Sequence, residues 1–227
     1  MYSEELKKLI PDFPKEKMEK LSLLEDEKEG IVHGVIGYLP ASMHIVFFAV
    51  DSKCDSDALF LKLIEEAEKA YKSRITVFSL NDRKDFYLNL GFEAEGEEES
   101  FEESSGVSME YMLGQKWLGR TVTVTVEHEY GSFHDLQEIT YPLNCGYVEE
   151  VLKETGEFSE AYVYGISEPV HSFTGIVTAL IYHKEDDEIR YVVSPVTLNI
   201  DPDEVKKAAG FNEQFYDTKF IFMKKRS

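Results

Sequence analysis

The chain has 227 residues, 43% of them hydrophobic and 30% charged, an ordinary globular mixture long enough for one large or two small domains. Its formal net charge of −20 argues against nucleic acid or an anionic membrane surface as partner, because both require clustered Lys and Arg. The N terminus lacks a signal-peptide pattern, and every apolar run is far shorter than the roughly 20 residues of a membrane span. Cys54 and Cys145 fit reduced thiols better than a disulfide framework, so we expect a soluble cytoplasmic protein.

Residues 1–114 are predicted to form one α/β domain, because strands alternate with helices as in crossover-connected units. The expected elements are helices over residues 4–10 and 15–24, strands over 30–39 and 42–50, a helix over 57–71, a strand over 74–80, a helix over 82–90 and two closing strands. The acidic stretch from Glu93 to Gly106 predicts an exposed hairpin tip between the closing strands.

The order of these elements, together with the sequence FYLNLGF at residues 86–92, is similar to the closing half of the N-acetyltransferase (GNAT) superfamily. The resemblance implies a loop between strand and helix whose backbone amides hold the pyrophosphate of coenzyme A. Here that loop has no glycine and carries Asp51, Asp55 and Asp57, which would repel a diphosphate. We therefore expect a degenerate acetyltransferase-like domain in which Asp55, Ser56 or Asp57 caps the helix and Tyr87 is a packing residue.

Residues 115–227 are predicted to form a second, β-dominated domain. Val122, Val124 and Val126 alternate with polar residues in a strand buried on one side, and three more short strands are expected over residues 161–166, 174–183 and 189–195. A helix follows, with Asp201 as its cap and Pro202 as its first residue. The pattern predicts a small closed barrel with a C-terminal helix, and hence an α+β chain overall.

The chemistry-bearing stretch runs from Glu138 to Tyr164. A predicted turn at Tyr141–Tyr147 is followed by Glu157 and Glu160, spaced i and i+3 at the entrance of a strand. Two carboxylates beside a rigid turn suit Mg²⁺, which prefers oxygen ligands and usually bridges to a substrate phosphate. A solvated acidic loop is the alternative interpretation.

The sequence YPLNCGY followed by TGEFSEAYVYG resembles the soluble inorganic pyrophosphatase family, which has Tyr-Pro-x-Asn-Tyr-Gly-Tyr and then Asp-Gly-Asp-Pro-x-Asp. The resemblance extends from about Leu118 to the C terminus and implies an oligonucleotide-binding-fold-like barrel with a metal and diphosphate site. It places Thr155, Glu157 and Glu160 where the family has aspartates. Cys145 stands where the family has a second tyrosine, Thr155 cannot supply a charge, and few basic residues remain to contact phosphate.

A second acidic cluster lies between two predicted strands, at residues 183–190. The resemblance implies that Asp186, Asp187 or Glu188 supply further metal ligands, and that Tyr141, Lys184 and Arg190 contact phosphate. The alternative is a charged hairpin loop. The histidines have no spacing typical of zinc ligands, and His134 is the one expected to face the site.

Three functions follow as hypotheses. The first is a hydrolase of pyrophosphatase type that uses Mg²⁺ and acts on a small phosphate-containing substrate. The second is a non-catalytic binding or assembly protein made of two degenerate enzyme domains. Acyl-CoA N-acetyl transfer is the third, and whether the protein is a homo-oligomer stays open.

Overall fold

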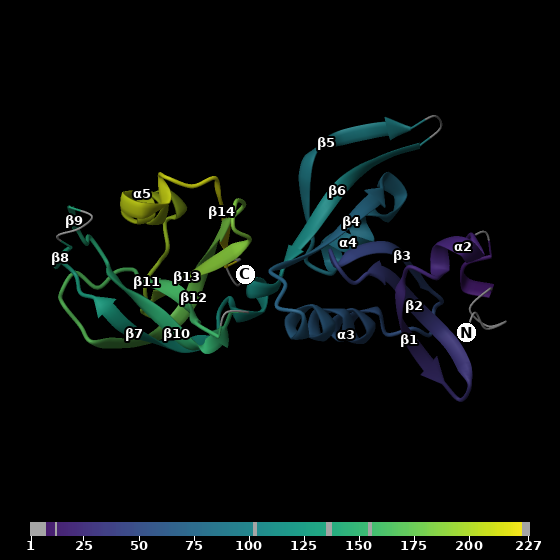
Figure 1. Cartoon of the computed structure of the whole chain (residues 1–227), viewed down its shortest axis with the longest axis horizontal. Coiled ribbons are helices and arrows are strands. Elements are labelled where there is room, and N and C mark those ends of the chain that lie inside the picture. Colours follow the sequence, from purple (N-terminus) through teal and green to yellow (C-terminus); the bar gives the residue numbers. More distant parts are fainter. Residues whose placement is uncertain (1–7, 12, 102–103, 135–137, 154–155, 224–227) are drawn as a thin grey trace. The chain divides into compact units, whose positions relative to one another are not determined.

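The computed structural model describes residues 8–11, 13–101, 104–134, 138–153 and 156–223, and the fold is α+β (Figure 1). The chain divides into two compact units, Met1–Leu113 and Gly114–Ser227. Within the described ranges, no helix has both the length and the apolar character needed to cross a membrane.

The first unit is one mixed sheet with its helices. Its elements are α2 (Lys15–Met18), β1 (Ser22–Lys28), β2 (Ile31–Leu39), β3 (His44–Val50), α3 (Ser56–Lys69), β4 (Arg74–Leu80), η1 (Asn81–Arg83), α4 (Lys84–Asn89), β5 (Glu93–Phe101) and β6 (Ser104–Met112). The strand order is β1-β2-β3-β4-β6-β5, and all neighbours are antiparallel except β3 and β4, which run parallel. The helix between the parallel strands, α3, is the crossover that this arrangement requires.

Helix α3 holds the core of the first unit together. Its buried residues are Leu59, Phe60, Leu63, Ile64 and Ala67, spaced so that one helix face meets the sheet. The Asp55 side chain accepts a hydrogen bond from the Ala58 amide and so caps the helix, as expected from the sequence.

One expectation for the first unit is wrong and another is correct only in part. The helix expected over residues 15–24 ends at Met18, and Ser22–Lys28 instead forms strand β1 along the outer edge of β2. The acidic stretch is largely exposed and lies in the hairpin of the last two strands as expected, but it is not all tip, because Glu93–Phe101 is itself strand β5, paired with β6. In both places pairing with a neighbouring strand overrides the local preference of the sequence.

The second unit is built on a closed ring of strands. Its elements are η2 (Leu113–Trp117), β7 (Thr121–His128), β8 (Phe133–His134), β9 (Ile139–Thr140), β10 (Asn144–Leu152), β11 (Phe158–Val163), β12 (Ser172–His183), β13 (Glu188–Ser194), α5 (Pro202–Glu213) and β14 (Thr218–Phe222). Pairings run β7-β10-β11-β13-β12 and return from β12 to β7, with only β11 and β13 parallel. This is the small closed barrel that the sequence predicts.

Strand β12 makes the closure possible because it is long and bent. Its first part pairs with β7, its second part pairs with β14, and its other edge pairs with β13. The register shifts between Val177 and Ala179, and a bulge of this kind bends a strand. Strand β14 was not among the elements expected from the sequence.

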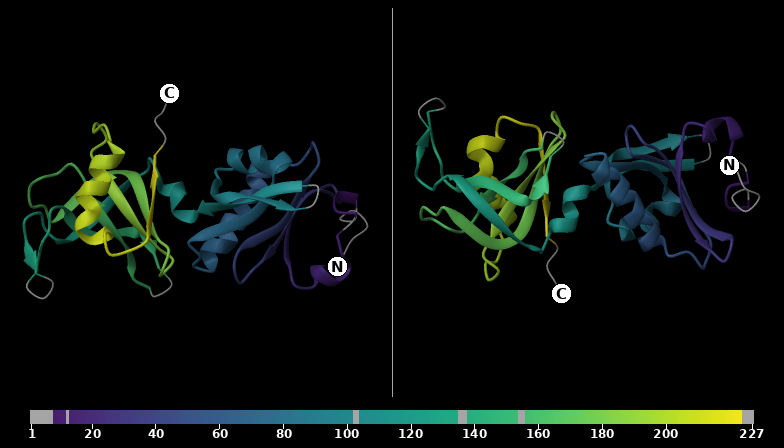
Figure 2. Two further views of the ribbon diagram at one scale, coloured as in Figure 1. Left: turned by 90° about the horizontal axis from the view of Figure 1, so that it is seen from above. Right: turned by 60° about the horizontal axis from the view of Figure 1, so that its bottom comes forward.

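Helix α5 lies across one side of the ring (Figure 2). Asp201 accepts a hydrogen bond from the Asp203 amide and Pro202 is the first helical residue, as expected. Val205 and Ala209 of α5 pack with Ile181 and Val192 of the ring in one buried cluster. The helix therefore covers an outer face of the barrel.

The motif at residues 141–147 is less of a turn than expected. From Asn144 onward it belongs to strand β10, and only Tyr141–Leu143 precede the strand. The correction follows from pairing, since Asn144 lies opposite Val163 of β11 and Cys145 lies opposite His128 of β7.

Candidate functional site

A polar cluster lies between the ring and α5. Side chains alternate along a strand, so Tyr162 of β11, Arg190 of β13 and His183 of β12 reach the outer face, while their neighbours point into the barrel. All three contact Glu213, the last residue of α5. The His183 side chain is 0% exposed and that of Glu213 is 3% exposed, so the cluster is almost fully withdrawn from water.

Glu213 is the centre of this cluster. Its Oε1 accepts hydrogen bonds from the Tyr162 hydroxyl at 2.5 Å and from Arg190 Nη1 at 2.8 Å. Its Oε2 lies 2.7 Å from His183 Nε2. The Tyr162 hydroxyl also accepts from Asn212 Nδ2 at 2.9 Å, and the Tyr216 ring stacks on His183 with centroids 4.3 Å apart.

The cluster sets the charge states of its members. Burial alone would raise the pKa of Glu213, but hydrogen bonds from His183 and Tyr162 and the charge of Arg190 outweigh burial and hold the pKa below its ordinary value. Burial raises the pKa of Tyr162, which therefore stays a neutral hydroxyl. Glu213 is thus a buried carboxylate, and the His183 Nε2 that faces it is a donor.

Glu160 and Arg190 meet across the parallel pair β11 and β13. Glu160 Oε2 lies 2.7 Å from Arg190 Nε, so the two side chains form an ion pair. Arg190 therefore has one carboxylate on each side, Glu160 half-exposed and Glu213 buried. Its positive charge is already more than balanced by these two neighbours.

An aromatic group borders the cluster at Tyr141. The His128 ring stacks on Tyr141 with centroids 4.4 Å apart, and His134 meets Tyr141 edge-on at 6.5 Å. The ring of Phe211 in α5 meets the ring of Tyr141 edge-on, with centroids 5.8 Å apart. Burial raises the pKa of Tyr141, with further contributions from Cys145 and Glu160.

The motif residues Asn144 and Gly146 have structural roles. Asn144 is fully buried, its Oδ1 accepts from the amides of Tyr130 and Val170, and its Nδ2 donates to the carbonyl of Glu168. It therefore ties two loops to the start of β10. A Cβ on Gly146 would lie 1.9 Å from the Thr125 carbonyl oxygen, so the close approach of β7 and β10 requires glycine.

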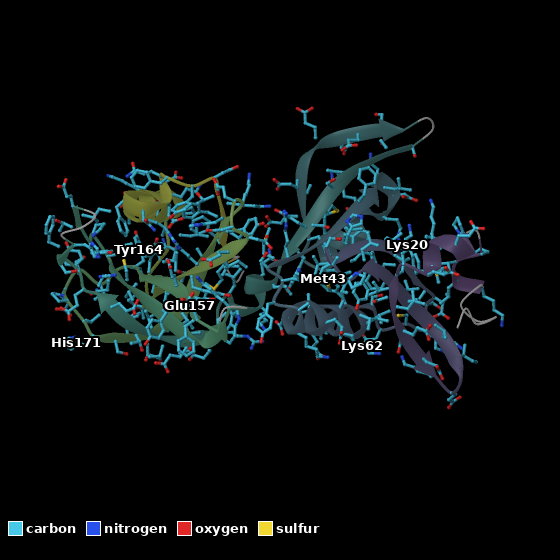
Figure 3. All side chains as sticks on the ribbon, in the orientation of Figure 1. Lys20, Met43, Lys62, Glu157, Tyr164 and His171 are labelled. Atoms are coloured by element: carbon cyan, nitrogen blue, oxygen red, sulfur yellow. The ribbon has the colours of Figure 1, made fainter. Side chains whose placement is uncertain are left out.

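The remaining predicted ligands gather at one end of β11 and β13. Ala161 lies opposite Tyr191 in parallel register, so Glu157, just before β11, and the turn that precedes β13 share that end. Glu157 and Tyr164, which flank β11, are labelled in Figure 3.

Each side chain of the turn has a polar contact. Asp186 Oδ2 lies 3.8 Å from His183 Nδ1, and Asp187 accepts a hydrogen bond from the Tyr182 hydroxyl. Glu188 forms an ion pair with Lys153 at 2.8 Å. Lys184 forms one with Asp217 at 3.3 Å. Thr155 lies outside the described residues.

These carboxylates have the donor chemistry that Mg²⁺ prefers. No group of three or more His, Cys, Asp or Glu side chains within the described ranges is placed to hold a metal. Mg²⁺ usually binds through only one or two carboxylates together with water and substrate phosphate oxygens, so a pair of carboxylates at this end fits such an ion.

The first unit has one stretch of interest, where β3 leads into α3. Asp51 Oδ2 lies 2.7 Å from His33 Nδ1, and its Oδ1 accepts from the Lys53 amide. The Asp55 amide donates to Asp26 at 3.3 Å. The loop is therefore held by its own carboxylates. Tyr87 is buried in the core beside Phe92.

Comparison with known proteins relates the two halves of the chain to two families. Residues 2–113 match the family model of an acetyltransferase (GNAT) domain. The comparison with curated proteins gave no match.

Among solved structures, the chain is similar to inorganic pyrophosphatase from Ehrlichia chaffeensis, with 11% identity, a TM-score of 0.38, and coverage of 47% of this chain and 88% of that one. The Helicobacter pylori pyrophosphatase is 12% identical, with a TM-score of 0.36 and coverage of 45% of this chain and 84% of that one. The aminoglycoside 6'-N-acetyltransferase from Enterococcus faecium is 14% identical, with a TM-score of 0.36 and coverage of 43% of this chain and 77% of that one. The N-terminal half thus resembles GNAT acetyltransferases and the C-terminal half resembles inorganic pyrophosphatases, at low identity.

Sequence reasoning did not identify Tyr162, His183 and Glu213 as one cluster. The pairing register, which the sequence alone does not show, places Tyr162 and His183 on the same side of the sheet as Arg190. Glu213 gave no signal, since a glutamate near a helix end is ordinarily solvated.

Proposed function

We propose that the second unit is a Mg²⁺-dependent phosphohydrolase that cleaves a small diphosphate. The observation that carries the proposal is the meeting of Glu160 and Arg190, 2.7 Å apart across β11 and β13. Tyr141 packs against Phe211, which also contacts Tyr162, a hydrogen-bond partner of Arg190. A carboxylate, a guanidinium and a phenol on one face are the groups that ligate a cation and contact phosphoryl oxygens.

The roles are divided between two groups of side chains. The candidate ligands are Glu157, Glu160, Asp186 and Asp187, of which one or two would hold the ion together with water and phosphate oxygens, since no three of the described carboxylates are placed around one point. Bound Mg²⁺ would neutralise phosphoryl oxygens and lower the pKa of an attacking water. Tyr141, Arg190 and Lys184 would orient the diphosphate, with Arg190 offering planar donors suited to phosphate.

The test is phosphate release from inorganic pyrophosphate with Mg²⁺ and with Mn²⁺. We expect release by the wild-type chain and its loss in the Glu157→Ala, Glu160→Ala double variant. The matched control is the Glu127→Ala, Glu204→Ala double variant, which removes two exposed carboxylates, one from β7 and one from the first turn of α5.

The control variant should retain activity, because its carboxylates lie on β7 and in the first turn of α5 rather than beside the start of β11 and β13. Absence of release from the folded wild-type chain would exclude pyrophosphate as the substrate. If the Glu157→Ala, Glu160→Ala variant retained as much activity as the control variant, Glu157 and Glu160 would be excluded as metal ligands.

A non-catalytic binding or assembly role is the second candidate, and one observation favours it. Arg190 already lies between Glu160 and Glu213, which leaves it little free positive charge for a phosphate. The two candidates differ in their response to metal, because an ion that binds only the native state raises its thermal stability. A melting temperature unchanged by Mg²⁺ and Mn²⁺, together with no phosphate release, would favour the second candidate.

Acyl transfer by the first unit is the third candidate, favoured by the family match over residues 2–113. An aminoglycoside 6'-N-acetyltransferase of similar structure has been solved in complex with coenzyme A. Acyl transfer of this kind would require the first unit to bind coenzyme A, and the residues around β3 and β4 bear on that requirement.

A further inference from the structure

Strands β3 and β4 are side by side only where they begin. Among their described residues the register pairs His44 with Thr76 and Ile45 with Val77, although each strand has seven residues. The opposite edges of the two strands are paired with β2 and β6. Beyond Ile45 the sheet therefore opens between β3 and β4, and an extended ligand with amide groups, such as the pantetheine arm of coenzyme A, could pair with such an edge.

The chain itself occupies this opening. Arg83 follows β4 and its Nη2 donates a hydrogen bond to the Phe48 carbonyl of β3 at 3.0 Å. The guanidinium also lies 4.7 Å from the centroid of the Phe86 ring, and Phe86 meets Phe48 edge-on at 5.1 Å. A backbone acceptor that a ligand would need is thus taken by an arginine, and aromatic rings pack beside it.

The loop that would receive the diphosphate is also occupied. The Ala58 amide, at the start of α3, donates to Asp55 Oδ1 at 3.0 Å, and the Lys53 amide donates to Asp51 Oδ1 at 2.7 Å. The hydrogen bond from His33 and that from the Lys53 amide hold the pKa of Asp51 below its ordinary value, so its carboxylate is charged. A diphosphate would have to displace carboxylates from these amides and then lie beside them.

We infer that the first unit does not bind coenzyme A, because Arg83 closes the opening between β3 and β4, Asp51 takes an amide of the loop before α3, and Asp55 takes an amide in the first turn of α3. The inference concerns the first unit alone and is independent of phosphohydrolase activity in the second. It implies that the resemblance to acetyltransferases is one of fold and not of cofactor binding.

Isothermal titration of the full chain with coenzyme A and, separately, with pantetheine tests the inference. We expect neither ligand to give a saturable isotherm with the wild-type chain, even in large molar excess. The Arg83→Ala variant should bind pantetheine, and the combined Arg83→Ala, Asp51→Asn, Asp55→Ser variant should bind coenzyme A as well. Serine keeps the helix cap while removing the charge, so the combined variant should stay folded.

The matched control is Lys84→Ala, which removes the cation next to Arg83 in the sequence. Lys84 forms an ion pair with Glu98. The control variant should bind neither ligand, like the wild type, and circular dichroism should show that every variant is folded. Saturable binding of coenzyme A to the wild-type chain would overturn the inference. Failure of the folded Arg83→Ala and combined variants to gain binding would overturn the roles assigned to Arg83 and the two aspartates.

Discussion

Arg190 of β13 and Glu213 of α5 form a buried ion pair, with Nη1 and Oε1 2.8 Å apart. The same carboxylate also accepts from Tyr162 and faces His183, so one side chain joins the C-terminal helix to three strands of the ring. The polar cluster is therefore a means of docking α5 as well as a candidate site.

Replacing Glu213 tests this docking. Glu213→Ala should lower the free energy of unfolding by about 3–5 kcal/mol, because it leaves the Arg190 charge with one fewer buried partner. Glu213→Gln should cost less, since the amide still fills the space and keeps one acceptor. Urea denaturation at neutral pH measures both. Glu204→Gln, at an exposed position on the same helix, is the control and should change stability by less than about 0.5 kcal/mol. Equal effects of the Gln variants at 204 and 213 would contradict the docking role.

The low pKa of Glu213 predicts a specific pH dependence. Its folded pKa lies below the ordinary value of 4.5, so the unfolded chain binds the proton more readily than the folded chain does. The stabilisation is complete above pH 4.5 and is lost as the pH falls through the folded pKa. The difference in unfolding free energy between wild type and Glu213→Gln should therefore shrink on acidification below pH 4.5. A difference that stays constant with pH would show that Glu213 does not titrate in this way.

Two glycines should respond to alanine with opposite signs. Gly146→Ala puts a Cβ 1.9 Å from the Thr125 carbonyl oxygen, and we expect a loss of about 2 kcal/mol or more because backbone must move. Gly210 lies inside α5 with nothing within 4 Å of a new Cβ, so Gly210→Ala should gain about 1 kcal/mol from helix propensity. Thermal or urea unfolding of both variants measures the pair. Destabilisation by both changes to a similar extent would be inconsistent with this structure.

The two thiols should be unreactive in the folded chain. Burial and the nearby Glu160 raise the pKa of Cys145 to about 12, and burial together with Asp26 raises that of Cys54 to about 11. The thiolate is the reactive form, so alkylation at mildly alkaline pH should be slow. In denaturant both thiols should be exposed and should be labelled fast. Mass spectrometry measures the extent of labelling at each cysteine. Cys54 should react first in the folded chain, because it is only partly buried while Cys145 is buried. Fast labelling of Cys145 without denaturant would show that the barrel face opens readily.

The sequence predicted the elements whose signals are local. Helix α3 and its Asp55 cap, helix α5 with Asp201 and Pro202, and the ring strands β7, β11, β12 and β13 follow from periodicity and turn chemistry, whereas β10 was expected to begin as a turn. The division of the chain near residues 114–115 stays an expectation, although compact units separate at Leu113 and Gly114.

Elements that depend on distant partners were not predicted. Strand β1 exists because β2 has an edge to pair with, and β14 exists because the second part of β12 offers one. The cluster around Glu213 depends on the docking of α5, which no local pattern encodes. The roles of Tyr141, Lys184, Arg190 and the four proposed metal ligands remain proposals, because they depend on a ligand and a substrate.

Ring closure has a consequence for how the second unit folds. Thr121 at the start of β7 pairs with Ile176 of β12, so the ring cannot close until most of the unit's chain is available. Pairings between residues far apart in sequence slow folding, whereas β12 and β13 are joined by a short turn and can form early as a hairpin. The β12–β13 hairpin is therefore the expected nucleus, and substitutions in β7 should accelerate unfolding more than they slow folding.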